Sequence, residues 1–565
     1  AAGRGFCCAY QGLPMLTYSP HTPPTLPKAP EKPWLLLLLC FVWLWPGIFG
    51  HAPWKPDEPY TLGVVHWMLH SGDGLVPRIG GVPFLDVPPL YYWVAVGFAK
   101  LLSPWLLPLH DAARLATPLF MSLTFLLLGL AGRELLGHRH GRSTVVILLG
   151  SLGLIEVGHQ LSTNVATLTG FAAAFYGLAL ALRRGFLGAI ALALGSTVLM
   201  LSGSLVDVAT VWLVALLLPL FEGWRTRQYI KAITIALALG MPLMLAWPLA
   251  LAKHAPSLYA QWWHSLALGS FYGFGRLGLL HEFGYYLRLL PWFTWPAWPL
   301  AGWALWRGRR RLNEARYQLP LLFVGMLLLI LVLSPRQNQL YARPLLLPLA
   351  ILAAAELDSL RRGVAALFNW FGVMALGLAS GLMWLGWVAM NFGWPAALAH
   401  KAVKYSPTYL PQLNGLAIGL AVVLSAAWVW AVTRKRLVGR QAVTNWAVGM
   451  TLLWSLASLL WLPWLDAQKS YASVVKSMQA TLLTLPTPNA CIATAHHHHL
   501  PRALWYYHGD ILLADYDTPS GRTCPRRLIL TAETPYQPEG EWQVKWQGTR
   551  PAEKREYYVL IERPS

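Results

Sequence analysis

The sequence contains little charge and little cysteine. Charged residues make up 12% of its 565 positions, about half of the roughly 25% found in soluble globular proteins. Together with a hydrophobic content of 56% and a mean hydropathy of +0.45, this excludes an ordinary soluble enzyme and a disordered or fibrous protein. Five cysteines are too few for a disulfide scaffold. No internal repeat and no cleavable signal peptide are evident, because the proline-rich stretch 18–33 precedes an apolar run typical of a first spanning helix.

Long apolar runs and tryptophan are abundant instead. The 30 tryptophans suit a chain that crosses a membrane, since Trp favours the membrane–water interface. The runs are too long and too many for a barrel. We therefore predict an all-α polytopic membrane protein with about thirteen spanning helices. The apolar runs lie at 34–50, 112–132, 143–159, 166–182, 186–203, 205–221, 231–252, 286–306, 317–333, 342–357, 364–390, 412–431 and 441–463.

The net charge of +20 is interpreted as a topology signal. If the proline-broken stretch 88–108 lies in the interface without crossing, six short loops between Arg133 and Arg440 carry 19 basic residues, and the opposite loops are longer and sparser in Lys and Arg. Such loops are cytoplasmic in membrane proteins, so no nucleic-acid partner is needed. The predicted organisation is a cytoplasmic segment 1–33, a membrane domain 34–463 with interfacial helices in its first outer loop 51–111, and an extracytoplasmic domain 464–565.

The last hundred residues are less apolar and read as a small α/β domain. A helix is predicted over 466–483, and strands over 511–513, 527–531, 542–546 and 557–561. Cys491 and Cys524 lie here, outside the membrane, so a disulfide and two free thiols are both open. The run His496–His499 is interpreted as a solvated loop, with metal binding as the alternative.

Ionisable residues converge on the predicted outer face. Asp57 and Glu58 follow the first span, and ionisable groups at membrane boundaries are functional candidates. A carboxylate there is suited to act as general base or to orient an acceptor, and Lys55 is near enough in sequence to keep Asp57 ionised. Arginines hold phosphate in forked hydrogen bonds. The loop after the seventh span adds Arg276, His281 and Glu282 to this face.

The motifs on this face resemble the GT-C glycosyltransferases, in particular the group of lipid A aminoarabinose transferases (ArnT) and protein O-mannosyltransferases. The order of motifs carries the resemblance over nearly the whole chain: Asp57-Glu58, PRIGGVPFLDVPPLYYW at 77–93, ARL at 113–115, HEFGYYLRLLPW at 281–292, LSPRQNQLYARPLLLPLA at 333–350 and DAQKSY at 466–471. The resemblance implies a GT-C membrane fold, a polyprenyl-phosphate sugar donor and an outer-face active site.

Site residues follow from the same resemblance. Asp57 matches the first-loop catalytic aspartate, and Asp86 and His264 match a pair associated with a metal, for which we expect a divalent ion such as zinc. The chain departs from the family at Val87, where a lysine is usual, at Asn164, where a second aspartate is usual, and at Trp263, where an acid is usual. Asp57 and Glu58 are the predicted catalytic residues, and the predicted substrate-binding residues are Arg78, Tyr91, Asn164, Tyr285, Arg336, Tyr341 and Arg343.

The predicted function is transfer of a sugar from a polyprenyl-phosphate donor to a lipid A, glycan or protein acceptor. The predicted location is the bacterial inner membrane, in contact with membrane lipids, with the active site on the periplasmic side. A transporter of lipids or lipid-linked sugars, using the same polar face without catalysis, is the alternative. A transporter has no need of a carboxylate pair at the outer interface, and the halves of this sequence show no symmetry.

Overall fold

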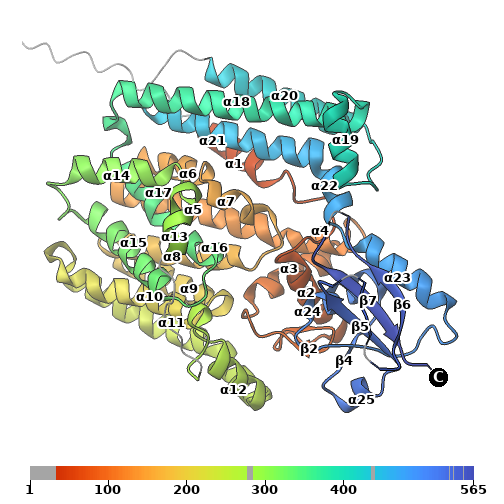
Figure 1. The fold of residues 1–565 in the computed structure, drawn as a ribbon. Helices are drawn as coiled ribbons and strands as arrows, with labels where there is room; N and C mark the ends of the chain where they lie inside the picture. Colours follow the sequence, from red (N-terminus) through yellow and green to blue (C-terminus); the bar gives the residue numbers. More distant parts are fainter. Residues whose placement is uncertain are drawn as a thin grey trace, which may run out of the picture.

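The computed structural model describes residues 33–275, 284–433 and 439–564, apart from 534, 539 and 552. Most of the described chain is helical, and a five-stranded sheet lies beside the helices near the carboxyl end (Figure 1). The predicted fold class, a polytopic all-α membrane protein with a small carboxyl-terminal α/β region, is confirmed.

The segment after the first helix is built from short elements. Helix α1 (Pro33–Leu44) leads into α2 (Glu58–Ser71), the hairpin β1 (Arg78–Ile79) and β2 (Val82–Pro83), α3 (Leu90–Leu102) and α4 (Leu109–Arg114). Helix α3 has 13 residues, whereas a span needs about 20. This length agrees with an interfacial position for 88–108, which stays a prediction.

A helical bundle follows. Eight helical stretches of the described chain are long and apolar enough to span a membrane, and α6 with the segment after it, bent by 74°, would make a ninth. Four shorter apolar helices bear on the remaining spans, so the count of thirteen stays a prediction. The bundle helices are α5 (Ala116–Leu136), α6 (His140–Leu149), α7 (Leu152–Ile155), α8 (Asn164–Ala181), α9 (Gly185–Ser202), α10 (Leu205–Leu217), α11 (Arg227–His254), α12 (Pro256–Ser265), α13 (Gly284–Phe293), α14 (Ala297–Gly308), α15 (Ala315–Leu333), α16 (Gln339–Ala342), α17 (Leu346–Ala355), α18 (Arg362–Phe392), α19 (Ala396–Tyr405), α20 (Gly415–Val432), α21 (Gly439–Leu456) and α22 (Leu462–Lys469).

Small residues let the bundle helices approach closely. A methyl group at Gly195 of α9 would lie 2.4 Å from the backbone nitrogen of Ala174 in α8. A methyl group at Gly177 of α8 would lie 2.5 Å from the nitrogen of Leu192 in α9. Membrane helices associate through such close contacts because lipid gives no hydrophobic drive between them.

The carboxyl-terminal sheet has the order β4-β3-β5-β7-β6. Strand β3 is parallel to β4 and β5, and β7 is antiparallel to β5 and β6. The elements of this region are α23 (Ala472–Thr484), β3 (Ile492–Thr494), α24 (His499–Gly509), β4 (Ala514–Asp515), α25 (Pro519–Arg522), β5 (Arg526–Thr531), β6 (Gln543–Gly548) and β7 (Tyr557–Glu562).

Three of the four predicted strands match β5, β6 and β7. The strand predicted at 511–513 is wrong, because those residues belong to no strand and the ladder begins at Ala514. The three-residue strand β3 was too short to predict. The single helix predicted over 466–483 is also wrong, since Ser470 has extended backbone angles and separates α22 from α23.

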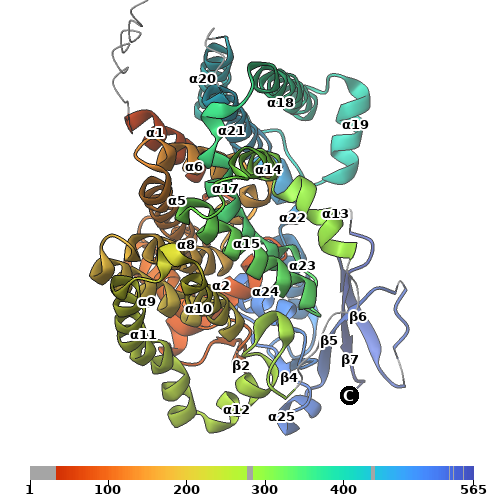
Figure 2. The same ribbon diagram turned by 90° about the vertical axis from the view of Figure 1, so that its left-hand side faces the viewer.

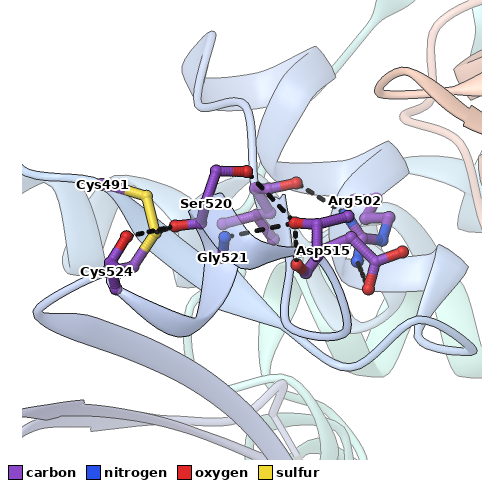
Figure 3. Close-up of a disulfide and its surroundings, with 9 residues drawn as sticks. Cys491, Arg502, Asp515, Ser520, Gly521 and Cys524 are labelled. Carbon is purple, nitrogen blue, oxygen red and sulfur yellow. Dashed lines mark hydrogen bonds and ion pairs between the residues drawn. A yellow bond between two sulfur atoms is a disulfide. The ribbon is translucent and has the colours of Figure 1, made fainter.

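The carboxyl-terminal region packs against the segment 51–111 that follows α1. Helix α24 packs against α2, and Gly63 of α2 is so close that a methyl group there would lie 2.8 Å from the side chain of Ala503. Both views show α2 and α24 side by side next to the sheet (Figures 1 and 2). Cys491 and Cys524 form a disulfide (Figure 3), which settles the open question between bridge and free thiols.

Candidate functional site

Glu58 is a buried structural acid. Its side chain is fully buried, and Oε1 accepts hydrogen bonds from Arg114 Nε at 2.8 Å and from the Leu161 backbone at 2.9 Å. Oε2 accepts from the Trp54 backbone at 2.8 Å. Burial raises the pKa of Glu58, but Arg114, His51 and these backbone donors outweigh burial, so the pKa is lowered. Both oxygens are occupied, and the predicted catalytic role does not fit this geometry.

Asp57 is only half buried, one residue before α2 begins. Its Oδ2 accepts hydrogen bonds from Ser162 Oγ at 2.8 Å and from Asn164 Nδ2 at 3.2 Å. The amide of Asn164 also donates to Ser162 Oγ at 3.0 Å. Two neutral donors therefore orient one carboxylate oxygen, and neither forms an ion pair that would neutralise the charge.

A buried arginine lies on the same side of the molecule as Asp57. Arg343 is 5% exposed, and its guanidinium interacts electrostatically with Asp57 and Glu156. Its Nε and Nη1 have no hydrogen-bond partner among the described residues. Because a buried guanidinium without partners is costly, these nitrogens are suited to an anionic ligand.

A second group of polar side chains, Asp86, Arg336 and Tyr341, lies near Asp57 and Arg343. Asp86 interacts electrostatically with Arg336, and Arg336 interacts with the hydroxyl of Tyr341. The Arg336 guanidinium also stacks 4.2 Å from the centre of the Tyr272 ring. The hydroxyl of Tyr92 is influenced by both Asp86 and Asp57, which links the two polar groups.

Three predicted substrate-binding residues have structural contacts instead. Tyr91 is fully buried and its hydroxyl bonds Thr117 Oγ1 at 2.7 Å. Arg78 donates to the Gly81 carbonyl at 3.1 Å and braces its own hairpin. Tyr285 packs edge-on against Tyr286, 5.0 Å between ring centres. None of these contacts points to a ligand.

The metal pair of Asp86 and His264 stays a prediction. Asp86 faces Arg336, whereas the exposed His264 packs against Gly275. No hydrogen bond or ion pair joins the two side chains within the described part of the chain. Two protein ligands are few for a metal, and we derive no step through one. His281, Glu282 and Arg276 lie outside the described residues.

Lys55 pairs with the carboxyl-terminal region and not with Asp57. Its ammonium contacts Glu556, which also accepts from Tyr471 at 2.9 Å. Asp466 accepts from the Ala52 backbone and from the Trp54 indole, both at 2.9 Å. The loop that carries Asp57 is therefore held by two contacts, one from Lys55 to Glu556 and one from Trp54 to Asp466.

Sequence reasoning missed two residues of the site. Ser162 donates the shorter bond to Asp57, and Arg114 neutralises Glu58. Arg114 lies inside the ARL motif, so a signal was present. Ser162 stands two positions before Asn164, but nothing in the sequence shows that its hydroxyl reaches Asp57.

The chain is similar to known proteins over most of its length. No protein-family model matches it. It is 28% identical, over 76% of its length and 75% of the relative, to the undecaprenyl phosphate-alpha-4-amino-4-deoxy-L-arabinose arabinosyl transferase of Pseudomonas aeruginosa strain UCBPP-PA14. The enzyme of the same name from Pectobacterium atrosepticum is 27% identical over 64% of this chain and 66% of its own.

A solved structure matches as well. ArnT from Cupriavidus metallidurans bound to undecaprenyl phosphate superposes with a TM-score of 0.64 at 18% identity, over 94% of this chain and 96% of that one. The resemblance that the motifs indicated is therefore confirmed: the chain has the ArnT fold and resembles the undecaprenyl phosphate-aminoarabinose transferases in sequence over three quarters of its length.

Proposed function

We propose that this protein is a membrane glycosyltransferase that transfers a sugar from an undecaprenyl-phosphate donor to an acceptor outside the cytoplasm. The relatives' name supports an amino-arabinose donor, and lipid A is the acceptor that the resemblance implies. The proposal places the chain in the bacterial inner membrane, with membrane domain 34–463, and with the site and residues 464–565 on the periplasmic side.

One observation carries the proposal. Asp57 presents a charged, half-buried carboxylate that Ser162 and Asn164 orient, and Arg343 offers two unpartnered guanidinium nitrogens within electrostatic reach of it. An anion and a cation held this way suit a reaction that needs a base or orienting group beside a phosphate.

The chemistry is a displacement at the anomeric carbon of the donor. An acceptor oxygen forms a bond to that carbon while the bond to the phosphate oxygen breaks, and undecaprenyl phosphate leaves with the electron pair. Arg343 binds the phosphate and stabilises its developing charge. A hydroxyl acceptor gives its proton to Asp57, whereas an ionised phosphate acceptor needs Asp57 only for positioning.

Asn164 leaves Asp57 as the one acid that can act as base or orient the acceptor. Its amide donates to Asp57 and cannot act as a base. Glu58 cannot substitute, because Arg114 and two backbone groups occupy it. Arg343 and Arg336 remain as phosphate ligands where Val87 replaces the lysine usual in the family.

The test is sugar transfer by purified protein. Wild type should move aminoarabinose from its undecaprenyl-phosphate carrier to lipid A. Asp57→Asn should lose about 10²–10⁴-fold in kcat while it still binds donor. Arg343→Gln should chiefly weaken donor binding, by about tenfold or more. Full turnover by the Asp57→Asn variant would rule out the assigned role.

A further inference from the structure

A second cluster of chemically reactive side chains lies in the carboxyl-terminal region, away from Asp57. His496, Asp515 and Asp517 each offer a ligand atom, and these atoms all lie within 4.8 Å of one another. His496 follows β3 by two residues, and Asp515 ends β4. Because β3 and β4 are parallel, with Thr494 paired to Asp515, their carboxyl ends bring the three residues to one edge of the sheet.

Local hydrogen bonds hold the cluster in place. His496 Nδ1 contacts Asp515 Oδ2, and the backbone nitrogen of Asp517 donates to Asp515 Oδ1 at 3.1 Å. The Tyr516 nitrogen donates to the Thr494 carbonyl at 3.0 Å and continues the pairing of the two strands. The ligand atoms are therefore arranged before any ion arrives, which lowers the entropy cost of binding one.

The disulfide region supports the same cluster. Cys491 precedes β3 and is bonded to Cys524, which follows α25 (Figure 3). Helix α25 sits tightly on the end of β4, since a methyl group at Gly521 would lie 1.9 Å from the Asp515 carbonyl oxygen. The bridge thus ties together the two segments that supply the ligands.

The charge balance favours a cation. The cluster contains two carboxylates, and the cation beside them is Arg502, whose Nη2 is 3.7 Å from Asp515 Oδ1. Arg502 is fully buried and committed to backbone carbonyls, with Nη1 donating to Leu513 at 2.6 Å and Nη2 to Thr494 at 3.1 Å. Arg502 interacts electrostatically with both Asp515 and Asp517, so one cation stands against two carboxylates.

A further imidazole lies next to the cluster. The His499 ring is 6.3 Å from the His496 ring, centre to centre. Its Nδ1 is buried and has no hydrogen-bond partner in the described part of the chain. A buried nitrogen without a partner is unusual, and here it stands beside three potential ligands.

We propose that His496, Asp515 and Asp517 bind a zinc-type divalent ion that links the segment after β3 to the segment after β4. Zinc accepts imidazole nitrogen and carboxylate oxygen together, whereas calcium and magnesium prefer oxygen ligands alone. The ion has a structural role. The His499 ring contacts Phe84 of the first outer loop, 5.3 Å between centres, so the ion stiffens the support of that loop.

The experiment is zinc binding to the purified full-length protein in detergent after removal of metal by a chelator. Bound zinc is counted by elemental analysis, and affinity is measured by competition with a chelator dye. Wild type should bind one zinc ion that His496→Ala and Asp517→Asn each weaken by at least about tenfold. His497→Ala removes an exposed histidine of the same run outside the cluster and should retain wild-type affinity.

Two controls establish whether the zinc is bound at this cluster. The Asp86→Asn variant should keep the ion, which distinguishes this site from the catalytic region. Zinc should raise the Tm of wild type and His497→Ala but not that of Asp517→Asn, while all three have the same Tm in chelator. Equal losses in His497→Ala and His496→Ala, or no zinc bound by wild type at micromolar concentration, would overturn the proposal.

Discussion

Asp57 and Glu58 are neighbours in the chain, but their carboxylates have opposite environments. Glu58 is enclosed by Arg114 and backbone donors, whereas Asp57 is half exposed and bonded to two neutral side chains. Glu58 therefore holds together the segments around it, whereas Asp57 stays accessible to a ligand. Two adjacent acids in a sequence can thus have very different environments.

Glu58→Gln should destabilise the protein strongly. The substitution removes one of the two carboxylates that pair with the fully buried Arg114, the other being Asp111 at 2.8 Å. Breaking a buried ion pair from one side costs about 3–5 kcal/mol. Thermal unfolding should show a clearly lower Tm for this variant, and Asp57→Asn, the matched control one residue away, should unfold close to wild type. The reverse order of Tm values would contradict the two assigned roles.

At the residue scale, the sequence named residues that the structure brings together, although their roles stay predictions. Asp57 and Asn164 were both named from the sequence, and the structure joins them. Lys55 was paired with the wrong acid, because its partner Glu556 lies about 500 positions away and only the tertiary fold brings it near. Tyr91 was assigned to substrate because the sequence does not show that both Tyr91 and Tyr92 are buried.

At the scale of elements, the contact between α2 and α24 links the outer loop to the carboxyl-terminal region. His66 of α2 lies 4.3 Å from the Tyr506 ring of α24, centre to centre. Burial lowers the pKa of His66 to about 4, and the neighbouring His70 adds to the shift. Burial likewise lowers the pKa of His508 in α24 to about 4.

Acid should therefore weaken this contact. An unfolded histidine takes up a proton near pH 6.5, whereas folded His66 stays neutral down to about pH 4. The unfolded state binds more protons between these values, so stability falls as pH drops from 6.5 towards 4. Tm measured across this range should fall, and His66→Phe should make the fall less steep. His70→Gln changes an exposed neighbouring residue and should keep more of the slope of Tm against pH than His66→Phe does. A fall in Tm as steep in His66→Phe as in wild type would refute the assignment.

Loss of the disulfide should loosen the carboxyl-terminal region. Cys491 and Cys524 are 33 positions apart, and closing a loop of this size stabilises a fold by about 2–4 kcal/mol. The double variant Cys491→Ser/Cys524→Ser should be cut by protease within this region at concentrations that leave wild type intact. The variant Cys40→Ser removes the free cysteine of α1 and serves as control; equal resistance of all three proteins would contradict a stabilising bridge.

On the scale of the whole molecule, composition and apolar runs predicted the fold class but not every helix. The run at 286–306 is divided into α13 and α14 around Pro296, and the run at 143–159 bends by 74°. Hydropathy records how apolar a segment is but not where the chain turns within it. The site spans segments more than 250 residues apart, so its assembly depends on tertiary packing.

The basic loops predict the orientation of the whole chain. With thirteen spans and a cytoplasmic amino-terminal segment, the carboxyl end lies in the periplasm. Alkaline phosphatase fused after Ser565 should be active, and the same enzyme fused after Arg184, in a predicted cytoplasmic loop, should be inactive. The opposite pattern would move the site to the cytoplasmic face and exclude a periplasmic acceptor.

The most direct test of the account distinguishes bond breaking from transport. Purified protein in liposomes is supplied with the aminoarabinose donor and lipid A, and the products are separated and counted by mass spectrometry. The account predicts that each sugar gained by lipid A is matched by one released undecaprenyl phosphate, and that Asp57→Asn slows both together. Movement of intact donor across the bilayer, with no undecaprenyl phosphate released, would contradict a glycosyltransferase and support a transporter.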